Sequence, residues 1–454
     1  MGPAPDQTTA GDTGMQALAR LAAPVVASRL GIMAMGLVDT IIVGRHSTAE
    51  LGYHALAWAV TGVVLTTALG LLGGVQVMTS QAIGEGRAAD TGAILRRGLI
   101  YAGWIALGFA AFLALAGGPI LTAFHMAPGL AEGATPVLRV QAVSLIPIII
   151  ADAGLFWLEA HGRALPGTIA MWVANIVNLA VNLWLVPGEN LLGVDGAAAS
   201  AWATFASRTF LLVALAIIIL RWNKAREYGV FAPAPDDPAA ARAMRAVGYG
   251  AAASYFIESL SFSAMAVFAG WISATAVAIW AVVINVAALV FMVPLGLSVA
   301  TSVLVGRAYG ARDRPAMLGA AGRGFAVTSV ALLLVSLGVW LEPAVIAAAY
   351  SRDPAVMAGI ASAMILSSLF FLADGLQVVA SQSLRARSDI VVPTATHVFS
   401  YVVVMMPLAW WLGVKSGGGV DGLIWAIIAA SLLSAVLLWG RFVLLGRQPL
   451  PPPA

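Results

Sequence analysis

Cysteine and charged side chains are what this 454-residue sequence most lacks. It has no cysteine, which excludes disulfides and thiolate metal sites. Only 10% of its residues are charged and 61% are hydrophobic. A soluble globule of this length needs more polar surface than these residues supply. The composition therefore predicts an integral membrane protein.

Catalytic and nucleotide-binding motifs are also missing. The sequence contains no P-loop, no nucleophile elbow and no HExxH helix, and its five histidines share no metal-ligand spacing. A membrane enzyme acting on lipid needs paired catalytic residues near one interface, and no such pair occurs. The basic residues are scattered between hydrophobic runs, without a dense stripe for nucleic acid. We expect no enzymatic activity, no cofactor and no nucleic-acid partner.

Twelve hydrophobic stretches are long enough to cross a membrane as helices, at roughly 20 residues each. No segment has the alternating pattern of a membrane strand, and the N-terminal segment 1–14 lacks the features of a cleaved signal. An all-α protein with twelve transmembrane helices is therefore predicted. The stretches lie near residues 16–44, 49–83, 93–117, 134–158, 165–187, 194–222, 244–271, 275–308, 318–347, 354–384, 392–413 and 420–444.

Lysine and arginine are distributed unevenly between the two sides of this bundle. If both termini lie on one side, that side collects 18 of the 24 basic residues, and Arg29 and Arg208 lie inside spans. Cytoplasmic loops carry the excess of such residues. Both termini are thus predicted to be cytoplasmic, in a multi-pass protein of a bacterial inner membrane. The preference for arginine over lysine, with abundant alanine, is typical of a GC-rich bacterial genome.

Two signals at one spacing indicate an internal repeat. Gly84 and Gly310 each end a long apolar run at a short polar exit, and the offset between them defines the repeat spacing. The GVDG sequence at 193–196 recurs at 419–422, at the same offset. Such repeats place a transport site between two halves. We expect a disordered cytoplasmic N-terminus (1–14), an N-lobe (15–222), a proline-rich cytoplasmic linker (223–243), a C-lobe (244–445) and a cytoplasmic tail (446–454).

Proline and glycine inside the spans have two interpretations. They allow close helix packing through small residues, or they let helices bend during a conformational cycle. Similar depths of the glycine pair and Pro294 in the two halves favour bending. The candidates are Pro24, Gly73, Gly74, Pro294 and Gly296.

Three carboxylates lie well inside predicted spans: Asp39, Glu258 and Asp374. A charge at mid-bilayer costs roughly 3 kcal/mol, so it normally faces a cavity or a partner. A carboxyl surrounded by hydrocarbon favours its neutral form, so each can bind and release a proton. The alternatives are a local cap at the outer interface for Asp39 and a purely structural polar network for the other two.

Polar side chains accompany these acids. Oxygen-rich clusters suit a proton or a hard monovalent cation, so Na⁺ at Glu258 and Asp374 is a second candidate. Three asparagines share one helix face and either join helices, for about 1 kcal/mol each, or face Asp39. The expected supporting network is Asn175, Asn178, Asn182, Ser254, Tyr255, Asn285 and Gln377.

Three further charges inside spans are weaker candidates. Asp152 and Glu159 belong to the fourth predicted span, and Glu159 is close to the basic cytoplasmic end of that span. Arg29 in the first span either extends toward the membrane surface or pairs with a carboxylate.

At these residues the chain resembles the multidrug and toxic compound extrusion (MATE) transporters, most closely the NorM-like bacterial branch. The resemblance covers residues 15–445. It is carried by VDTIIVG around Asp39, SYFIESLSF around Glu258, INVAALVFMVPLGLSVATSVLVGRAYGARD, and DGLQVVASQSLRARSD from Asp374. It implies two six-helix lobes related by a pseudo-two-fold axis along the membrane normal, with a V-shaped central cavity.

The resemblance also implies a function. The family's acidic residue in helix 1 corresponds to Asp39, its helix 5 asparagines to Asn178 and Asn182, and its later carboxylates to Glu258 and Asp374. Phe370 replaces a tyrosine of some NorM-like members, which favours H⁺ over Na⁺ as the coupling ion. We expect a monomeric antiporter in membrane lipid that exchanges H⁺ or Na⁺ for cationic amphipathic drugs. The alternative is a lipid-linked oligosaccharide flippase of the same superfamily, although the intramembrane charges here are mainly acidic.

Overall fold

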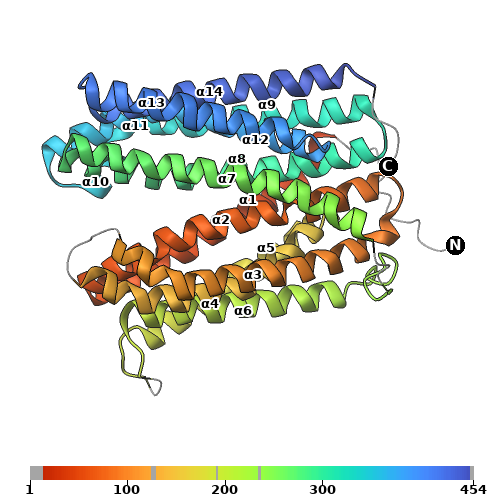
Figure 1. Cartoon of the computed structure of the whole chain (residues 1–454), viewed down its shortest axis with the longest axis horizontal. Coiled ribbons are helices and arrows are strands. Elements are labelled where there is room, and N and C mark those ends of the chain that lie inside the picture. The colour runs from red at the N-terminus through yellow and green to blue at the C-terminus, as the bar shows by residue number, and fades with distance from the viewer. Residues whose placement is uncertain (1–13, 124–128, 191–192, 234–236, 450–454) are drawn as a thin grey trace. The chain divides into compact units, whose positions relative to one another are not determined.

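The described part of the chain is helical apart from its connecting loops (Figure 1). The computed structural model describes residues 14–123, 129–190, 193–233 and 237–449. Residues 1–13 and 450–454, which fall in the expected disordered N-terminus and tail, lie outside it. Twelve helices in the described ranges are long and apolar enough to cross a membrane, and no β-strand occurs there. The all-α fold with twelve spans is confirmed.

The helices follow the order of the predicted spans, and the eleventh span consists of four consecutive segments, two of them π-helical. The elements are α1 Met15–His46, α2 Thr48–Gly84, η1 Ala88–Asp90, α3 Thr91–Ala123, α4 Leu130–Ala160, α5 Ala164–Leu185, α6 Gly196–Leu220, α7 Pro238–Ile272, α8 Ala274–Gly310, α9 Arg314–Leu341, α10 Pro343–Tyr350, α11 Pro354–Ala386, α12 Val391–His397, η2 Val398–Met405, α13 Met406–Ala409, η3 Trp410–Lys415 and α14 Gly419–Gly446.

The ninth span ends earlier than expected. The hydrophobic run predicts one helix over 318–347, whereas α9 ends at Leu341 and a separate helix, α10, begins at Pro343. Proline has no N–H to donate to the preceding turn and restricts the residue before it, so the helix ends there. The expectation of one continuous helix is wrong.

The chain folds into two compact units. The N-unit comprises residues Ala27–Thr79 and Arg87–Ala252, and the C-unit comprises α1 up to Val26, Ser80–Gly86 and the chain from Ala253 onward. The boundaries at Val26 and Ala252 are separated by the repeat spacing found in the sequence. The start of each repeat's first helix thus belongs to the unit built mainly from the other repeat.

Glycines permit close helix contacts at equivalent places in the two repeats. A Cβ on Gly70 would overlap the backbone of Ala252 in the N-unit, and a Cβ on Gly296 would overlap the backbone of Val26 in the C-unit. Both the glycines and the residues they contact are related by the repeat spacing. Gly84 and Gly310 form a reciprocal contact in the C-unit, since a Cβ on either would overlap a backbone carbonyl of the other's helix. The glycine pair that reveals the repeat in the sequence is therefore required where α2 and α8 approach each other.

The ends of the repeated helices also match. After α2 and α8, Gly86 and Arg312 adopt left-handed backbone conformations with φ of 77° and 59°, and after α4 and α11, Gly162 and Ser388 do so with φ of 78° and 66°. The members of each pair are separated by the repeat spacing. Left-handed residues close helix ends by redirecting the last N–H groups to free carbonyls. Arg312 and Ser388 keep this conformation without glycine, so the turn geometry is a property of the repeat.

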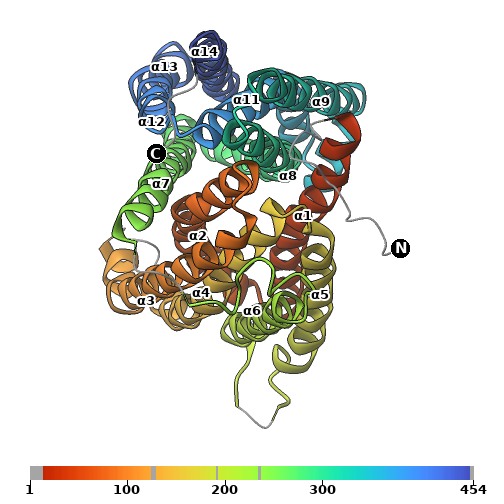
Figure 2. The same ribbon diagram turned by 90° about the vertical axis from the view of Figure 1, so that its right-hand side faces the viewer.

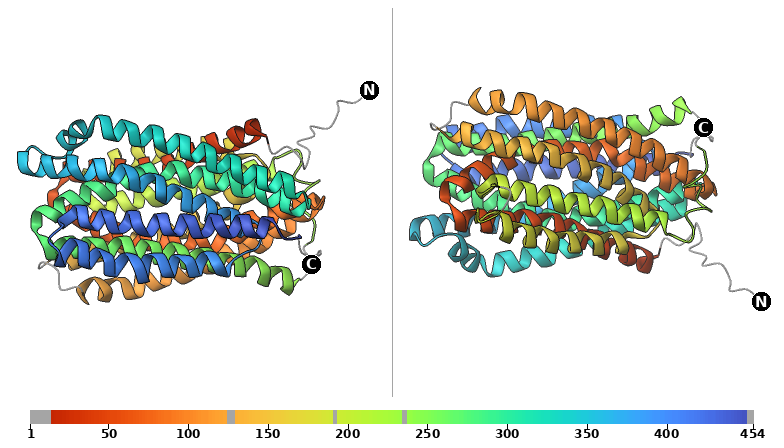
Figure 3. Two further views of the ribbon diagram at one scale, coloured as in Figure 1. Left: turned by 90° about the horizontal axis from the view of Figure 1, so that it is seen from above. Right: turned by 90° about the horizontal axis from the view of Figure 1, so that it is seen from below.

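One helix lies at the centre of each unit. In the N-unit α4 contacts α3, α5 and α6, and it is the most deeply buried of the twelve spans (Figure 1). In the C-unit α11 contacts α8, α9 and α14, and α14 also packs along the segmented eleventh span (Figure 2). The long helices of each unit run side by side along one direction (Figure 3). Many large apolar side chains on the outer helix faces are exposed, Leu115 and Trp104 among them, as expected for lipid contact.

The segment between the halves is partly anchored to the N-unit. The guanidinium of Arg96 donates hydrogen bonds to the carbonyls of Gly229 and Val230 at 2.9 and 2.8 Å. Helix α7 begins at Pro238, inside the segment 223–243, where the carboxylate of Asp237 accepts a hydrogen bond from a backbone N–H of the first turn. Proline suits this first position because its missing N–H is not needed there.

Candidate functional site

Asp39 of α1 is buried in the N-unit and bound by neutral donors from two other helices. Its side chain is 3% exposed. The Asn182 amide of α5 donates to Oδ1 at 2.8 Å, and the Thr204 hydroxyl of α6 donates to Oδ2 at 2.7 Å. Because both partners come from other helices, Asp39 is not a local cap. None of the ion pairs among the described residues includes it.

The three asparagines of α5 divide between the two roles considered for them. Asn175 donates to the backbone carbonyls of Gly31 in α1 and Met171 in its own helix, at 3.0 and 2.9 Å, so it joins two helices. Asn182 binds the Asp39 carboxylate directly, and Asn178, fully buried one turn earlier, faces the same carboxylate. One helix face thus supplies both the packing contact and the amides around the acid.

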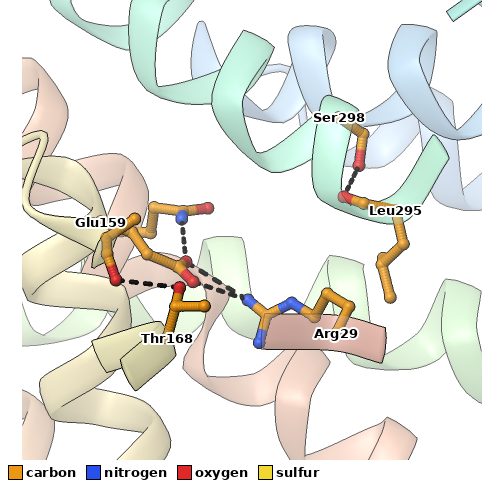
Figure 4. Close-up of polar contacts among 7 residues, drawn as sticks. Arg29, Glu159, Thr168, Leu295 and Ser298 are labelled. Carbon is orange, nitrogen blue, oxygen red and sulfur yellow. Dashed lines mark hydrogen bonds and ion pairs between the residues drawn. The ribbon is translucent and has the colours of Figure 1, made fainter. Parts of the chain in front are cut away.

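A second buried polar group in the N-unit contains an ion pair. Arg29 of α1 points toward Glu159 of α4 (Figure 4), and its Nη2 lies 3.1 Å from Oε1. The two side chains are 3% and 1% exposed. The amide of Gln76 donates a further hydrogen bond to Oε2 of Glu159 at 3.0 Å. Arg29 therefore pairs with a carboxylate rather than extending to the membrane surface. The positive charge of Arg29 and the negative charge of Glu159 compensate each other.

In the C-unit, Glu258 of α7 and Asp374 of α11 lie on either side of one amide. The two acids are 8% and 5% exposed. The Nε2 group of Gln377 donates to Oε1 of Glu258 at 3.3 Å and to Oδ1 of Asp374 at 3.4 Å. The hydroxyl of Tyr401 in η2 donates to the same oxygen of Asp374 at 3.2 Å. The structure brings together the two acids and the glutamine that the sequence singles out.

The remaining candidates lie at or beyond the edge of this cluster. Ser254 is fully buried on α7, and the hydroxyl of Tyr255 accepts a hydrogen bond from Gln382 at 2.7 Å. Asn285 of α8 is elsewhere, because its amide oxygen accepts a hydrogen bond from the Tyr350 hydroxyl of α10 at an exposed position. The structure gives Asn285 no contact with the carboxylates among the described residues.

The helix-bending candidates differ in their surroundings. A Cβ on Gly74 would overlap the carbonyl of Met244 in the N-unit, so Gly74, like Gly296, allows close packing. Gly73 has more room, since its nearest neighbour would be 3.9 Å away. Pro24 lies inside α1, two residues before the boundary between the units. Pro294, inside α8, packs against Gly375.

Three hydroxyl groups of the two sites are missing from the sequence-based candidates: Thr204, Tyr401 and Ser431, whose hydroxyl lies 3.5 Å from Asp374. No motif marks them, because other serines, threonines or polar residues occur in the same spans and no spacing singles these three out. The π-helical turn that carries Tyr401 also has no recognisable sequence signal, although π-helical turns are frequent at functional sites. The described residues contain no group of three or more His, Asp and Glu side chains that could hold a metal ion.

Comparison with known proteins shows the family and the repeat together. The family model described as MatE matches the chain twice, at residues 24–184 and 251–411, which together make up well over half of it. The two matches start at a spacing one residue longer than that of Gly84 and Gly310. The tandem repeat inferred from the sequence is confirmed.

Similar proteins span nearly the whole chain. A probable multidrug resistance protein NorM of Caulobacter vibrioides is 51% identical over 434 residues, covering 95% of this chain and 92% of that protein. A probable NorM of Rhodopseudomonas palustris is 32% identical and covers 98% and 95%.

Among solved structures, an outward-facing multidrug resistance MATE family transporter of the MOP superfamily matches with a TM-score of 0.87 at 18% identity, over 95% of this chain and 96% of that one. At this identity the match shows the fold alone. The two matches to the family model and the close NorM relatives carry the assignment further. The chain belongs to the MATE family of multidrug efflux transporters, among its NorM-type proteins, and is a multi-pass membrane transporter rather than an enzyme.

Proposed function

We propose that this protein exports cationic amphipathic compounds by antiport with H⁺ or Na⁺. An inward-moving cation binds to Asp39, or to the Glu258 and Asp374 pair, and weakens the binding of a positively charged drug. The drug leaves as the cation arrives. Bending or rotation of helices then returns the drug-free, cation-loaded site to the cytoplasmic side, where the cation is released.

The observation that supports this proposal is how the three carboxylates are satisfied. Each is buried, and each accepts hydrogen bonds only from amides and hydroxyls among the described residues. A buried carboxylate with a fixed arginine partner is already neutralised, as Glu159 is by Arg29. A carboxylate held by neutral donors keeps its negative charge available for a mobile cation.

The donor sets suit either coupling ion. The side-chain oxygens of Asn182 and Gln377 have no hydrogen-bond partner among the described residues, and each belongs to an amide that donates to a site carboxylate. A carboxylate with neighbouring neutral oxygens resembles the oxygen ligands of a hard cation, and the same carboxylate can take up a proton. Tyr401 supplies a hydroxyl to Asp374, where position 370 supplies none.

The membrane potential can drive this exchange without a nucleotide. A cation that crosses a potential of 100 mV gains roughly 2.3 kcal/mol. This drive requires placement in an energised membrane, and the arginine-rich loops favour a bacterial inner membrane with both termini cytoplasmic. The direction of coupling then follows from the inward gradient of H⁺ or Na⁺.

Everted membrane vesicles test the proposal. Uptake of a cationic fluorescent dye is measured under an imposed pH gradient and, separately, under a Na⁺ gradient. Asp39→Asn, Glu258→Gln and Asp374→Asn are expected to remove most of the gradient-driven uptake, because a neutral amide does not take up a proton near neutral pH and has no negative charge to compensate Na⁺. The matched control is Asp90→Asn, which neutralises an exposed carboxylate with 58% side-chain exposure. Full uptake in all three buried variants would contradict the proposal.

A further inference from the structure

The N-unit contains a partly open cavity of about 40 Å³ that is lined by Asp39. Its wall includes three charged side chains, Asp39 of α1, Asp152 of α4 and Arg208 of α6, together with the indole of Trp58 from α2. The volume exceeds the space that one water molecule needs. A cavity of this size in a membrane helix bundle, with charge of both signs on its wall, can hold a small ion and its hydration.

Arg208 carries a positive charge that belongs permanently to this cavity. Its side chain is 5% exposed, and its Nη1 donates to the hydroxyl of Ser144 at 2.7 Å and to the carbonyl of the same residue at 3.5 Å. It forms no ion pair with either aspartate among the described contacts, although both lie within electrostatic range. Ser144 thus holds the guanidinium within electrostatic range of both carboxylates, without an ion pair to either among the described residues.

Asp152 is a buried carboxylate whose hydrogen bonds are incomplete. It is 2% exposed, and its Oδ1 has no hydrogen-bond partner among the described residues. The charged groups that face it are Arg29, Glu159 and Arg208. An acceptor of this kind costs free energy unless something else occupies the space in front of it. Asp152 lines the cavity together with Asp39 and Arg208.

The charges of the cavity do not cancel. Arg29 and Glu159 neutralise each other in their ion pair. His54 of α2, which faces Asp39, adds no charge in its neutral form. Ionised Asp39 and Asp152 together with Arg208 therefore leave one negative charge in a region with little water. One monovalent cation restores neutrality.

We propose that Asp152 is a second cation-binding carboxylate of the N-unit, and that Arg208 is a counter-ion shared by Asp39 and Asp152, so that the cavity takes up one H⁺ or Na⁺. When the cation is bound at one carboxylate, Arg208 compensates the other. When the cation leaves, Arg208 is shared again. This assignment rests on the proposed antiport, and it makes the net charge of three residues the quantity that decides cation uptake.

Substitutions that change this net charge in opposite directions test the assignment. The full-length protein is labelled with 5-fluorotryptophan in lipid nanodiscs, and the Trp58 resonance is identified by its loss in Trp58→Phe. Trp58 is a local reporter, since its ring lies against Gly36, one turn before Asp39, in the cavity wall. Its ¹⁹F shift is followed first as the pH is lowered in choline chloride, and then as NaCl replaces choline chloride at constant ionic strength.

The expected result is a charge-dependent series. The wild-type resonance responds to H⁺ or to Na⁺. Asp152→Asn abolishes the response although Asp39 is intact, because Asp39 and Arg208 then compensate each other. The double variant Asp152→Asn with Arg208→Gln restores the response, because one negative charge is present again. A wild-type ¹⁹F response in Asp152→Asn would overturn the assignment. So would a double variant whose Trp58 resonance, like that of Asp152→Asn, responds neither to H⁺ nor to Na⁺.

Two controls keep the result decisive. If Asp152→Asn is not monodisperse, Arg208→Gln alone decides, because its two uncompensated carboxylates should bind two cations and give a response with two steps, and an unchanged single step overturns the assignment. Dye uptake in vesicles separates this proposal from the antiport itself. Loss of uptake in Asp39→Asn but not in Asp152→Asn refutes only the role of Asp152. If Asp39→Asn keeps full dye uptake while the Trp58 resonance still follows the charge series, the proposed antiport coupling is refuted. The assignment of the cation site to Asp39, Asp152 and Arg208 then stands.

Discussion

The two units make the contact between the first and fourth helices of the repeat with different side chains, an ion pair in one unit and an arginine over an aromatic ring in the other. In the N-unit Arg29 of α1 forms an ion pair with Glu159 of α4. The positions one repeat spacing later are Tyr255 of α7 and Arg385 of α11, where the guanidinium lies over the tyrosine ring at 5.9 Å from its centre. The arginine has moved to the other helix of the pair, and no carboxylate faces it at the equivalent position. The repeat keeps the contact between its first and fourth helices while the side chains that make it change.

The three buried carboxylates singled out in the sequence differ even more between the units. The positions equivalent to Asp39, Glu258 and Asp374 hold Met265, Ile32 and Ile148. The helix ends after α2 and α8 and after α4 and α11, and two pairs of crossing glycines, by contrast, repeat at one spacing. Backbone geometry is therefore shared by the two units, whereas each unit places its acids at positions of its own. The N-unit and the C-unit therefore hold two different groups of buried carboxylates on one scaffold, and selective changes can separate them.

The largest difference in stability between variants of the two units is expected at the contact between the first and fourth helices of the repeat. Glu159→Gln leaves the buried guanidinium of Arg29 without its counter-ion, and removal of one partner from a buried ion pair costs about 3–5 kcal/mol. Tyr255→Phe in the C-unit removes one hydrogen bond, with an expected loss of about 1 kcal/mol. Thermal unfolding of the purified protein in detergent measures both. Equal losses of stability in the two variants would contradict this expectation, because they would mean that Arg29 is not left as an uncompensated buried charge in Glu159→Gln.

The twelve spans and the three acids could be predicted from the sequence because hydrophobic length and buried charge are both local signals. The spacing of the asparagines placed Asn182 on one helix face with Asn175 and Asn178, and left open whether that face packs helices or meets Asp39; the structure shows Asn182 bound to Asp39. The helix break before Pro343 also has a local signal, a proline within a hydrophobic run, although the predicted span continues through it.

The hydroxyls of Thr204, Tyr401 and Ser431 could not be predicted in the same way. Lipid and protein interior are both apolar, so a membrane helix has no polar stripe that shows which face is turned inward. The sequence therefore does not reveal which isolated hydroxyl meets a distant carboxylate. The same limit left Arg29 without an assigned partner and placed Asn285 with the ion-site residues, whereas it binds Tyr350.

A smaller effect, equal on both sides, is expected where the repeats are alike. In Gly84→Ala and Gly310→Ala the new methyl group overlaps a backbone carbonyl of the facing helix, so α2 and α8 must move apart. Overpacking of this kind costs about 1–3 kcal/mol, and the reciprocal geometry predicts similar losses in the two variants.

Gly103→Ala is the matched control, because no atom lies within 4 Å of its added methyl group. Melting temperatures of the three variants in the same detergent measure the effect. Unchanged stability in Gly84→Ala, or a loss as large in Gly103→Ala, would contradict the role of the glycine pair in this helix contact.

The smallest expected effect distinguishes the two proposed cation sites by a single hydroxyl. Tyr401→Phe removes the hydrogen bond to Asp374 and keeps the ring, which packs beside His397. A hydrogen bond between membrane helices contributes about 1 kcal/mol, which corresponds to roughly a fivefold change in cation affinity. We expect dye uptake in Tyr401→Phe vesicles to require a different H⁺ or Na⁺ concentration for half-maximal rate. The Trp58 signal of the N-unit should be unchanged, since Tyr401 belongs to the C-unit. A shift at Trp58 as large as the shift in uptake would mean that the two sites do not bind cations independently.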